Sequence, residues 1–280
     1  MIKTIGVVVK HGSTTGYEIA RKVLEYGSNV LGLEMLLEEE ISVDINWRNT
    51  FSLGRDRVDI IMVIGGDGTL FRTLHRLGED VVPIMTVKAG RRGFLLDVYP
   101  EEVFDRLRDL VEGRYRLVEY MRLETSIEGR YTRALPLAIN DVVIINWPSL
   151  RTKIIRIRIN VDGEELYRVE GDGIIIATPL GSSGYALAAG GPLIDIDLEA
   201  ISLVPIASIQ FNTKPVVLAP SRRIEIEILS ESGPVACIVD GQSIETVYPG
   251  EIIRIGRARS KVPIIRFRYV NSYARLKYIE

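Results

Sequence analysis

The chain of 280 residues is long enough for one large domain or two ordinary ones, and its 46% of apolar residues can build a substantial core. A formal net charge of −2 gives no basic field that would attract nucleic acid or an anionic membrane. No apolar run approaches the roughly 18 residues of a membrane-spanning helix. We therefore expect a cytoplasmic globular protein that binds neither nucleic acid nor membrane.

Cysteine and histidine are too scarce for several common kinds of site. Cys237 is the single cysteine, so an intrachain disulfide and a cysteine-cluster zinc site are excluded, and its apolar surroundings place it in the core. His11 and His75 are the only histidines, which excludes a multi-histidine metal site. There is no Gly-x-Ser-x-Gly turn for a serine hydrolase. Any metal is expected to be a hard cation held by oxygen, Mg²⁺ above all.

Strands and helices alternate over the first third of the chain. Apolar runs predict strands at 5–9, 58–64 and 83–87. Apolar residues at helical spacing predict helices at 17–26, 69–77 and 100–112. This alternation predicts a doubly wound parallel sheet in an α/β domain at residues 1–113.

A period of two replaces this pattern beyond about residue 114. Residues 156–159 and 224–228 alternate strictly, and 161–164 carry the residues of a hairpin turn. Apolar residues at 135–139 and 142–145 predict a further strand that contains the polar pair at 140–141. Residues 114–280 are therefore predicted to form a mainly β domain with a glycine-rich insertion near 181–191, and its last residues are expected to pack back on the first domain.

Residues 65–70, Gly-Gly-Asp-Gly-Thr-Leu, join the buried strand at 58–64 to the helix at 69–77. Glycine lets the backbone turn sharply and approach a ligand, and the N–H groups at a helix start favour an anion such as phosphate. The carboxylate of Asp67 would repel phosphate, so it fits better as a base acting on a hydroxyl or as a partner of a metal ion. This motif favours a phosphoryl-transfer site, although Asp-Gly is also a common structural turn.

Four further segments are candidates for ligand contacts, each with a structural alternative. They are the basic turn at 90–94, the polar pair Asn140-Asp141, the glycine-rich segment 171–192, and Asp240-Gly241-Gln242. The first and last can be plain turns, and a buried polar pair needs hydrogen-bond partners whether or not it binds a ligand. Segment 171–192 is the most specific, because its small hydroxylic residues and glycines precede a tyrosine. Neither a P-loop nor a Rossmann fingerprint is present.

Taken together, these segments resemble the NAD kinase family in its archaeal or bacterial form. The resemblance rests on Gly-Gly-Asp-Gly-Thr, a Gly-Phe-Leu segment, the Asn-acidic pair, and Asp-Gly-(apolar)-Thr-Pro-x-Gly-Ser-x-x-Tyr with Gly-Gly-Pro, in that order. It implies an NAD kinase-like fold and phosphorylation of the adenosine 2′-hydroxyl of NAD to NADP, with ATP or polyphosphate as donor. It also implies NAD(H) and NADP(H) as ligands, Mg²⁺ or another divalent cation bridging the donor phosphates, and a homodimer or homotetramer.

The resemblance further assigns residues to the site. Asp67 matches the general base of the family, and Arg72 matches a basic position that can face phosphate. The other positions implied in NAD or ATP binding are Gly65, Gly66, Gly68, Thr69, Gly93, Phe94, Asn140, Asp141, Asp172, Thr178, Ser182, Ser183, Gly184, Tyr185, Ala188, Ala207 and Gln242. No side chain is assigned as a metal ligand.

Some positions depart from the commoner family pattern: Asp141 replaces Glu, Ser183-Gly184 replaces Thr-Ala, and Lys88, Glu170 and Ile209 replace Asn, a basic residue and His. Two alternatives stay open on the sequence. A diacylglycerol- or sphingosine-type lipid kinase shares the Gly-Gly-Asp-Gly turn but leaves segment 171–192 unexplained. A non-catalytic NAD(P)-binding sensor would keep the fold, although the presence of Asp67 argues against it.

Overall fold

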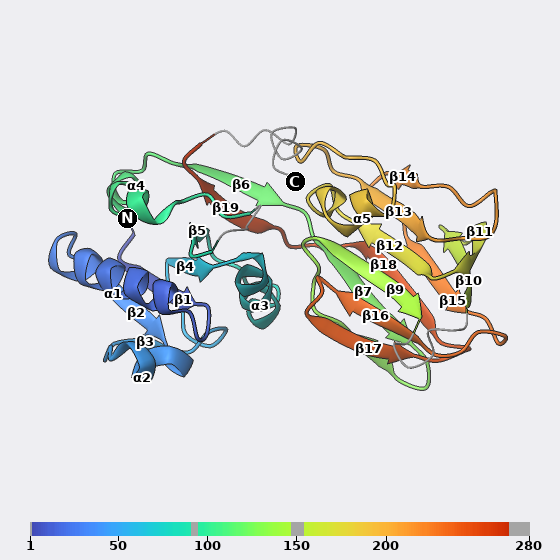
Figure 1. Ribbon diagram of the computed structural model, residues 1–280, viewed down its shortest axis with the longest axis horizontal. Coiled ribbons are helices and arrows are strands. Elements are labelled where there is room, and N and C mark those ends of the chain that lie inside the picture. Colours follow the sequence, from blue (N-terminus) through green and yellow to red (C-terminus); the bar gives the residue numbers. More distant parts are fainter. Residues whose placement is uncertain (1, 91–94, 147–153, 269–280) are drawn as a thin grey trace. The chain divides into compact units, whose positions relative to one another are not determined.

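The computed structural model describes residues 2–90, 95–146 and 154–268, and the chain divides into two compact units (Figure 1). The first unit contains the chain up to Tyr120 and the segment that begins at Lys261, and the second contains Met121–Ser260. The division differs from the boundary expected at 113/114 because strand β6 (Arg116–Tyr120) pairs with β19 (Val262–Arg266) of the first unit. Among the described residues, no helix has the length and apolar character needed to cross a membrane.

The first unit is built on a seven-stranded sheet with the order β3-β2-β1-β4-β5-β19-β6. Its remaining strands are β1 (Thr4–Val9), β2 (Glu34–Glu38), β3 (Thr50–Phe51), β4 (Ile60–Gly65) and β5 (Ile84–Lys88). All neighbours pair in parallel except β19 and β6. Every residue of β4 is buried, as is typical of a central parallel strand covered on both faces.

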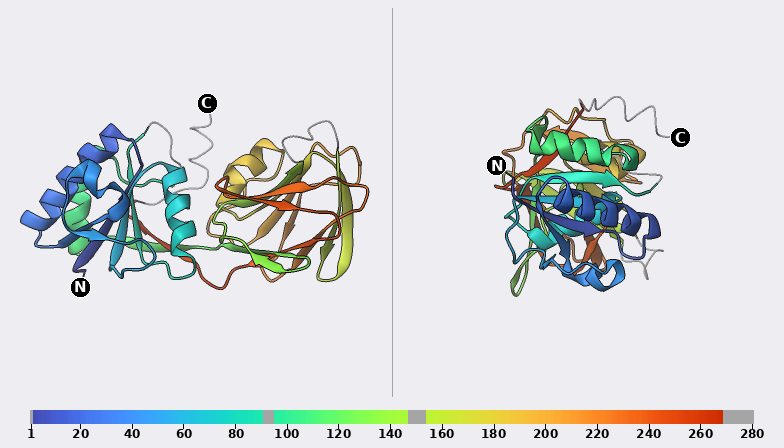
Figure 2. Two further views of the ribbon diagram at one scale, coloured as in Figure 1. Left: turned by 90° about the horizontal axis from the view of Figure 1, so that it is seen from below. Right: turned by 90° about the vertical axis from the view of Figure 1, so that its left-hand side faces the viewer.

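Helices cover both faces of this sheet: α1 (Thr14–Asn29), α2 (Ser42–Ile45), α3 (Asp67–Leu77) and α4 (Val103–Val111). Apolar residues of α1 and α4 form one core cluster with Ile60, Met62 and Ile64 of β4. Figure 2 shows α1 and α4 side by side, and the rings of Tyr26 and Phe104 lie 4.6 Å apart. The alternate residues of β4 are buried on the other face, where α3 packs. The predicted doubly wound α/β fold is confirmed.

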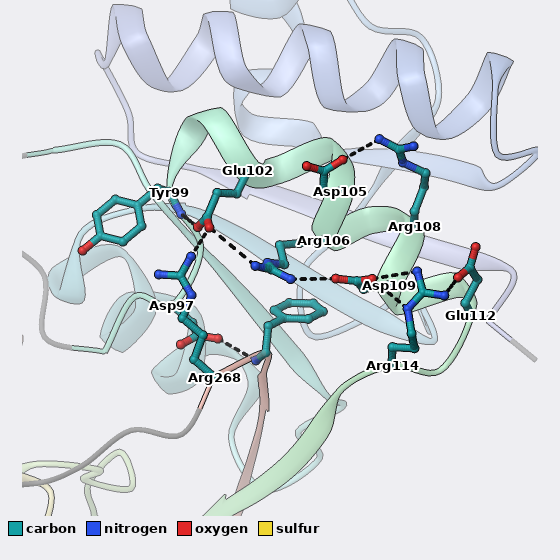
Figure 3. Close-up of polar contacts among 11 residues, drawn as sticks. Asp97, Tyr99, Glu102, Asp105, Arg106, Arg108, Asp109, Glu112, Arg114 and Arg268 are labelled. Atoms are coloured by element: carbon teal, nitrogen blue, oxygen red, sulfur yellow. Dashed lines mark hydrogen bonds and ion pairs between the residues drawn. The ribbon is translucent and has the colours of Figure 1, made fainter.

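A chain of ion pairs connects α4 with the residues that follow β19 (Figure 3). Arg106 contacts Asp109 at 2.7 Å and Glu102 at 3.5 Å, and Glu102 also contacts Arg268. The backbone N–H of Phe267 donates to Asp97 at 2.8 Å. These contacts fix the C-terminal strand against segments that precede it by well over a hundred residues.

The second unit consists of two antiparallel six-stranded sheets, with the orders β11-β10-β15-β18-β7-β8 and β14-β13-β12-β9-β16-β17. The strands of the first of these sheets are β7 (Leu123–Glu128), β8 (Thr132–Ala134), β10 (Ile155–Val161), β11 (Glu164–Gly171), β15 (Ile224–Ile228) and β18 (Ile252–Arg257). Those of the other are β9 (Asp141–Asn146), β12 (Gly173–Ala177), β13 (Ile201–Ile206), β14 (Val216–Leu218), β16 (Val235–Val239) and β17 (Ser243–Val247), and the short helix α5 (Tyr185–Ala188) lies near β12.

The inward-facing residues of both sheets form one core, as in a β-sandwich. Cys237 belongs to it, which confirms its predicted core position; burial raises the pKa of its thiol to about 12. The strand predicted around the polar pair forms only from Asp141 onward, and in its first part, 135–139, only Ala138 makes an isolated bridge, with Leu123. The backbone of Ile139 instead hydrogen-bonds to side chains of Asp240 and Thr178, so it is not available to a ladder.

Candidate active site

The glycine turn of the first unit lies where β4 ends and α3 begins. Gly65 closes the strand, Gly66 precedes the helix in an extended conformation, and Asp67 is the first helical residue. A Cβ atom on Gly65 would lie 2.4 Å from the hydroxyl oxygen of Thr69. Only glycine at this position therefore lets Thr69 pack beneath the turn, which explains the tight passage from strand to helix.

The carboxylate of Asp67 is held by the segment that follows β5. Its Oδ1 atom accepts the backbone N–H of Leu95 at 3.0 Å. The carbonyl of Leu95 in turn accepts the hydroxyl of Thr86 at 3.1 Å and Nη1 of the buried Arg266 at 2.9 Å. Asp67 is partly exposed. Its carboxylate is oriented by the N–H of Leu95, and the carbonyl of the same residue is held by Thr86 and Arg266.

A pocket of about 320 Å³ opens at the N-terminus of α3. It is lined by Lys10, His11, Gly66, Gly68, Thr69 and Arg72. Two cations therefore meet backbone groups at the positive end of an eleven-residue helix. Such a pocket is suited to an anion such as a phosphate chain. Gly93 and Phe94, predicted to contact nucleotide from the next loop, lie outside the described residues.

Behind this pocket lies a carboxylate that the sequence analysis did not assign to the site. Glu38, at the end of β2, is completely buried and contacts Arg76 at 2.5 Å and Arg72 at 3.7 Å. Burial raises its pKa, against the opposing effect of the two guanidinium groups. In the sequence it precedes Glu39 and Glu40, and this acidic run gives no sign of burial.

In the second unit, the polar pair lies at the start of β9. The carboxylate of Asp240 accepts the backbone N–H groups of Ile139, Asn140 and Asp141 at 3.0, 2.8 and 3.1 Å. Asp240 adopts a left-handed backbone with φ of 48°, which turns the chain after β16. The segment around 240 is thus a turn, as its sequence allowed, and its carboxylate also holds the backbone of the pair.

Asp141 is the most strongly perturbed carboxylate of this region. It is buried, and desolvation together with the nearby charge of Asp240 raises its pKa to about 7. A carboxyl group with such a pKa can either donate or accept a hydrogen bond near neutral pH. Perturbed groups of this kind are enriched at functional sites.

Thr178 and Ser182 are fully buried, and their hydroxyls hold the glycine-rich loop together. Thr178 donates to the carbonyl of Ile139 at 2.6 Å and accepts the N–H of Gly181 at 3.1 Å. Ser182 accepts the N–H of Ile194 at 2.9 Å. Both side chains therefore hold the loop in shape, because their hydroxyls bond to backbone groups of the protein.

The loop and the polar pair are adjacent in space. A Cβ atom on Gly181 would lie 2.1 Å from the carbonyl oxygen of Asn140, so the close approach requires glycine. Ser183, Gly184, Tyr185 and Ala188 follow, and the last three are exposed. Gln242 is also exposed, in the turn after Asp240. These predicted ligand contacts form one group with Asn140 and Asp141.

Asp172 and Ala207 form a second group at the other end of β12. The chain crosses between the two sheets at Asp172, and a Cβ atom on Gly171 would lie 2.7 Å from the carbonyl of Ala207. Asp141 pairs with Ala177 at the far end of the strand. Five residue steps, from Asp172 to Ala177, therefore separate the two groups, which is about 17 Å at about 3.4 Å per residue.

Both halves of the chain match models of known protein domains. Residues 5–115 match the model of the ATP-NAD kinase N-terminal domain, and residues 139–267 match that of the ATP-NAD kinase C-terminal domain. An NAD kinase of Aeropyrum pernix is 37% identical over 98% of this chain and 96% of its own.

Two solved structures share the fold. A crystal structure of an NAD kinase from Archaeoglobus fulgidus in complex with ATP has a TM-score of 0.75 at 28% identity, over 99% of this chain and all of that chain. A crystal structure of yeast NADH kinase complexed with NADH has a TM-score of 0.90 at 22% identity, over 99% of this chain and 87% of that one. By its two domain matches and its identity to full-length relatives, the chain belongs to the NAD kinase family.

Proposed function

We propose that this protein is an NAD kinase that transfers the γ-phosphoryl group of ATP to the adenosine 2′-hydroxyl of NAD. One observation carries the chemistry: the carboxylate of Asp67 is oriented by the amide of Leu95 in the glycine turn, beside the pocket lined by Lys10 and Arg72. Family membership supplies the substrate. Relatives that match this chain over 93–96% of their own length are NAD kinases.

In this proposal Asp67 is the general base. It accepts the proton of the 2′-hydroxyl while that oxygen bonds to the γ-phosphorus, and the bond to the β–γ bridging oxygen breaks to release ADP. A positioned base typically contributes about 10²–10⁴-fold to the rate. Lys10 and Arg72, with the N-terminus of α3, stabilise the charge on the transferred group.

The donor phosphates occupy the pocket at Gly66 and Gly68, whose missing side chains leave the backbone accessible. Among the described residues there is no group of three side chains of the kind that binds a metal ion. Mg²⁺ fits this arrangement as a counter-ion of the phosphates, since it often binds through phosphate and water with few protein ligands. When bound, it neutralises phosphate charge.

The acceptor binds through the second unit, with Asn140, Asp141 and Tyr185 holding its adenosine part. The rest of this surface is formed by Ser183, Gly184, Ala188 and Gln242. The loop that carries it is held by the buried hydroxyls of Thr178 and Ser182. Asp172 and Ala207 contribute from the other end of β12. A cytoplasmic location, a homodimer or homotetramer, and polyphosphate as an alternative donor remain predictions from the family resemblance.

The decisive assay measures NADP or NADPH formation with NAD or NADH, each combined with ATP or polyphosphate. We expect product with NAD and ATP. Phosphate incorporation into a lipid but not into NAD would instead identify a lipid kinase. Tight NADP binding without turnover by any donor would identify a sensor.

Replacing Asp67 with Asn tests the base directly. The amide keeps the shape and accepts the Leu95 N–H but takes up no proton, so we expect kcat to fall by about 10²–10⁴-fold while NAD binding stays measurable. Asp80→Asn, at an exposed carboxylate beyond the same helix, is the matched control and should retain activity. Turnover of Asp67→Asn at the wild-type rate would exclude Asp67 as the base.

A further inference from the structure

Glu38 is an unusual residue to find behind a pocket for anions. Its side chain is 0% exposed, and its Oε1 atom accepts a hydrogen bond from Arg76 at 2.5 Å. Its Oε2 atom is buried and has no hydrogen-bond partner among the described residues. Burying a carboxylate in this way costs stability unless it is fully paired, and an apolar residue at the end of β2 would avoid that cost.

The guanidinium of Arg72 lies between this carboxylate and the pocket. Its Nη2 atom is 3.7 Å from Oε2 of Glu38, close enough for charge attraction but too far for a hydrogen bond. Nε and Nη2 of Arg72 are both buried and lack hydrogen-bond partners among the described residues. Arg72 also lines the pocket at the start of α3. It is therefore attracted to Glu38 without being locked by a hydrogen bond.

A second carboxylate nearby offers a comparison. Glu40 contacts Arg76 at 2.9 Å and His11 at 3.4 Å, but its side chain is 44% exposed and it makes no ion pair with Arg72. Arg76 thus has a carboxylate on each side, one buried and one in solvent. Glu38 differs from Glu40 in its burial and in its contact with Arg72, whereas Glu40 meets the pocket lining only at His11.

We propose that Glu38 is a positioning residue for the phosphoryl donor, because its buried charge keeps the guanidinium of Arg72 at the wall of the pocket and ready to turn toward a phosphate. The proposal rests on the proposed function, since it assigns the donor phosphates to this pocket. A charged donor entering beside Lys10 and Arg72 would supply the hydrogen-bond acceptors that Arg72 lacks. Glu38 itself touches no substrate and acts through Arg72.

Neutralising each carboxylate in turn separates this role from a purely structural one. Glu38→Gln keeps the shape but removes the charge, and we expect it to raise the KM for ATP about tenfold, as for the loss of one charge-assisted hydrogen bond. The KM for NAD should change by less than about twofold, whereas kcat should fall as well, because Arg72 also stabilises charge on the transferred phosphoryl group. Glu40→Gln removes the other carboxylate on Arg76 and should leave the KM for ATP within about twofold.

A double-mutant cycle tests whether Glu38 acts through Arg72. Arg72→Gln should also raise the KM for ATP, and adding Glu38→Gln to it should have little further effect. Independent, multiplicative effects of the two substitutions would overturn the proposal. So would a Glu38→Gln enzyme that only melts at a lower temperature and keeps the wild-type KM for ATP.

Inorganic tripolyphosphate provides a readout that does not depend on NAD phosphorylation. It should raise the melting temperature of the wild type and of Glu40→Gln by more than that of Glu38→Gln or Arg72→Gln, since a tenfold weaker affinity gives a smaller stabilisation at the same concentration. An equal shift in all four proteins would overturn the proposal, even if the protein proved to phosphorylate no dinucleotide. If Glu38→Gln does not fold, Glu38→Asp replaces it; its charge is kept but withdrawn by one methylene, and an unaltered tripolyphosphate shift would likewise contradict the proposal.

Discussion

Asp141 and Asp240 are neighbouring carboxylates in very different environments. The carboxylate of Asp240 accepts three backbone N–H groups. Asp141 is buried, and this desolvation together with the nearby charge of Asp240 raises its pKa to about 7. In the unfolded chain Asp141 would ionise near its ordinary value, so the folded state keeps a proton over a range of pH in which the unfolded state has lost it.

This difference predicts a pH dependence of stability. Since the pKa of Asp141 is raised on folding, its favourable contribution is complete below about pH 4 and is lost as the pH rises to about 7. Asp141→Asn should abolish this slope and raise the free energy of unfolding at pH 8, by up to about 4 kcal/mol. Urea unfolding at a series of pH values measures both effects.

The same substitution should weaken the acceptor site. Asn cannot ionise, so if Asp141 holds the adenosine part of NAD, we expect the KM for NAD to rise about tenfold while stability increases. Asp80→Asn serves as the control for removing a carboxylate elsewhere. A pH profile of unfolding that is identical in Asp141→Asn and the wild type would contradict the proposed environment of Asp141.

Between elements, Arg266 connects β19 to the segment that orients Asp67. It is 2% exposed, and it donates to Leu95 at 2.9 Å and to the hydroxyl of Tyr120 at 3.0 Å, with Asp97 at 3.9 Å. The hydrogen bond of Leu95 to Asp67 lies on the other side of the same peptide segment. Arg266 of β19 therefore supports the proposed base, Asp67, through the Leu95 segment, although the two residues lie far apart in the sequence.

Arg266→Met should be strongly destabilising. It removes one partner of a buried ion pair and leaves the carboxylate of Asp97 uncompensated, which typically costs about 3–5 kcal/mol in the free energy of unfolding. We also expect kcat to fall, because the carbonyl of Leu95 loses its hydrogen bond from Arg266 and the segment that orients Asp67 is held less firmly. Tyr120→Phe is the control: it removes the hydroxyl but keeps Arg266, and should cost only about 1 kcal/mol. Equal losses in the two variants would argue against a role for the Leu95 contact.

The sequence predicts some of these elements much better than others. Helices α1, α3 and α4 follow from their apolar spacing, and β4 follows from its continuous apolar run. Strand β2 and the edge strand β3 are not predicted in this way, because β2 has glutamates at both ends and β3 has only two residues. In the candidate site, the glycine turn can be recognised from the sequence because its residues are adjacent in the chain. The roles of Glu38 and Asp240 cannot, since each depends on contacts between residues far apart in the chain.

At the scale of the whole molecule, the order of the chain and the order of the sheet do not coincide. β19 comes last among the described strands but lies inside the first sheet, between β5 and β6. Val262, Ile264 and Ile265 are all completely buried there. The second unit, in contrast, draws its described strands from one continuous stretch, Met121–Ser260.

This arrangement predicts that the two units differ in their ability to fold alone. Residues 121–260 should fold as a separate fragment, with β-type far-UV circular dichroism and a cooperative urea transition, because both sheets and their shared core are complete. Residues 1–120 alone should not unfold cooperatively, since β5 and β6 lose the buried strand between them. Joining 1–120 to 261–280 through a flexible linker should restore the transition. A cooperative transition in 1–120 alone would show instead that the parallel strands and their helices suffice, and that β19 contributes to the orientation of Asp67 rather than to the folding of the unit.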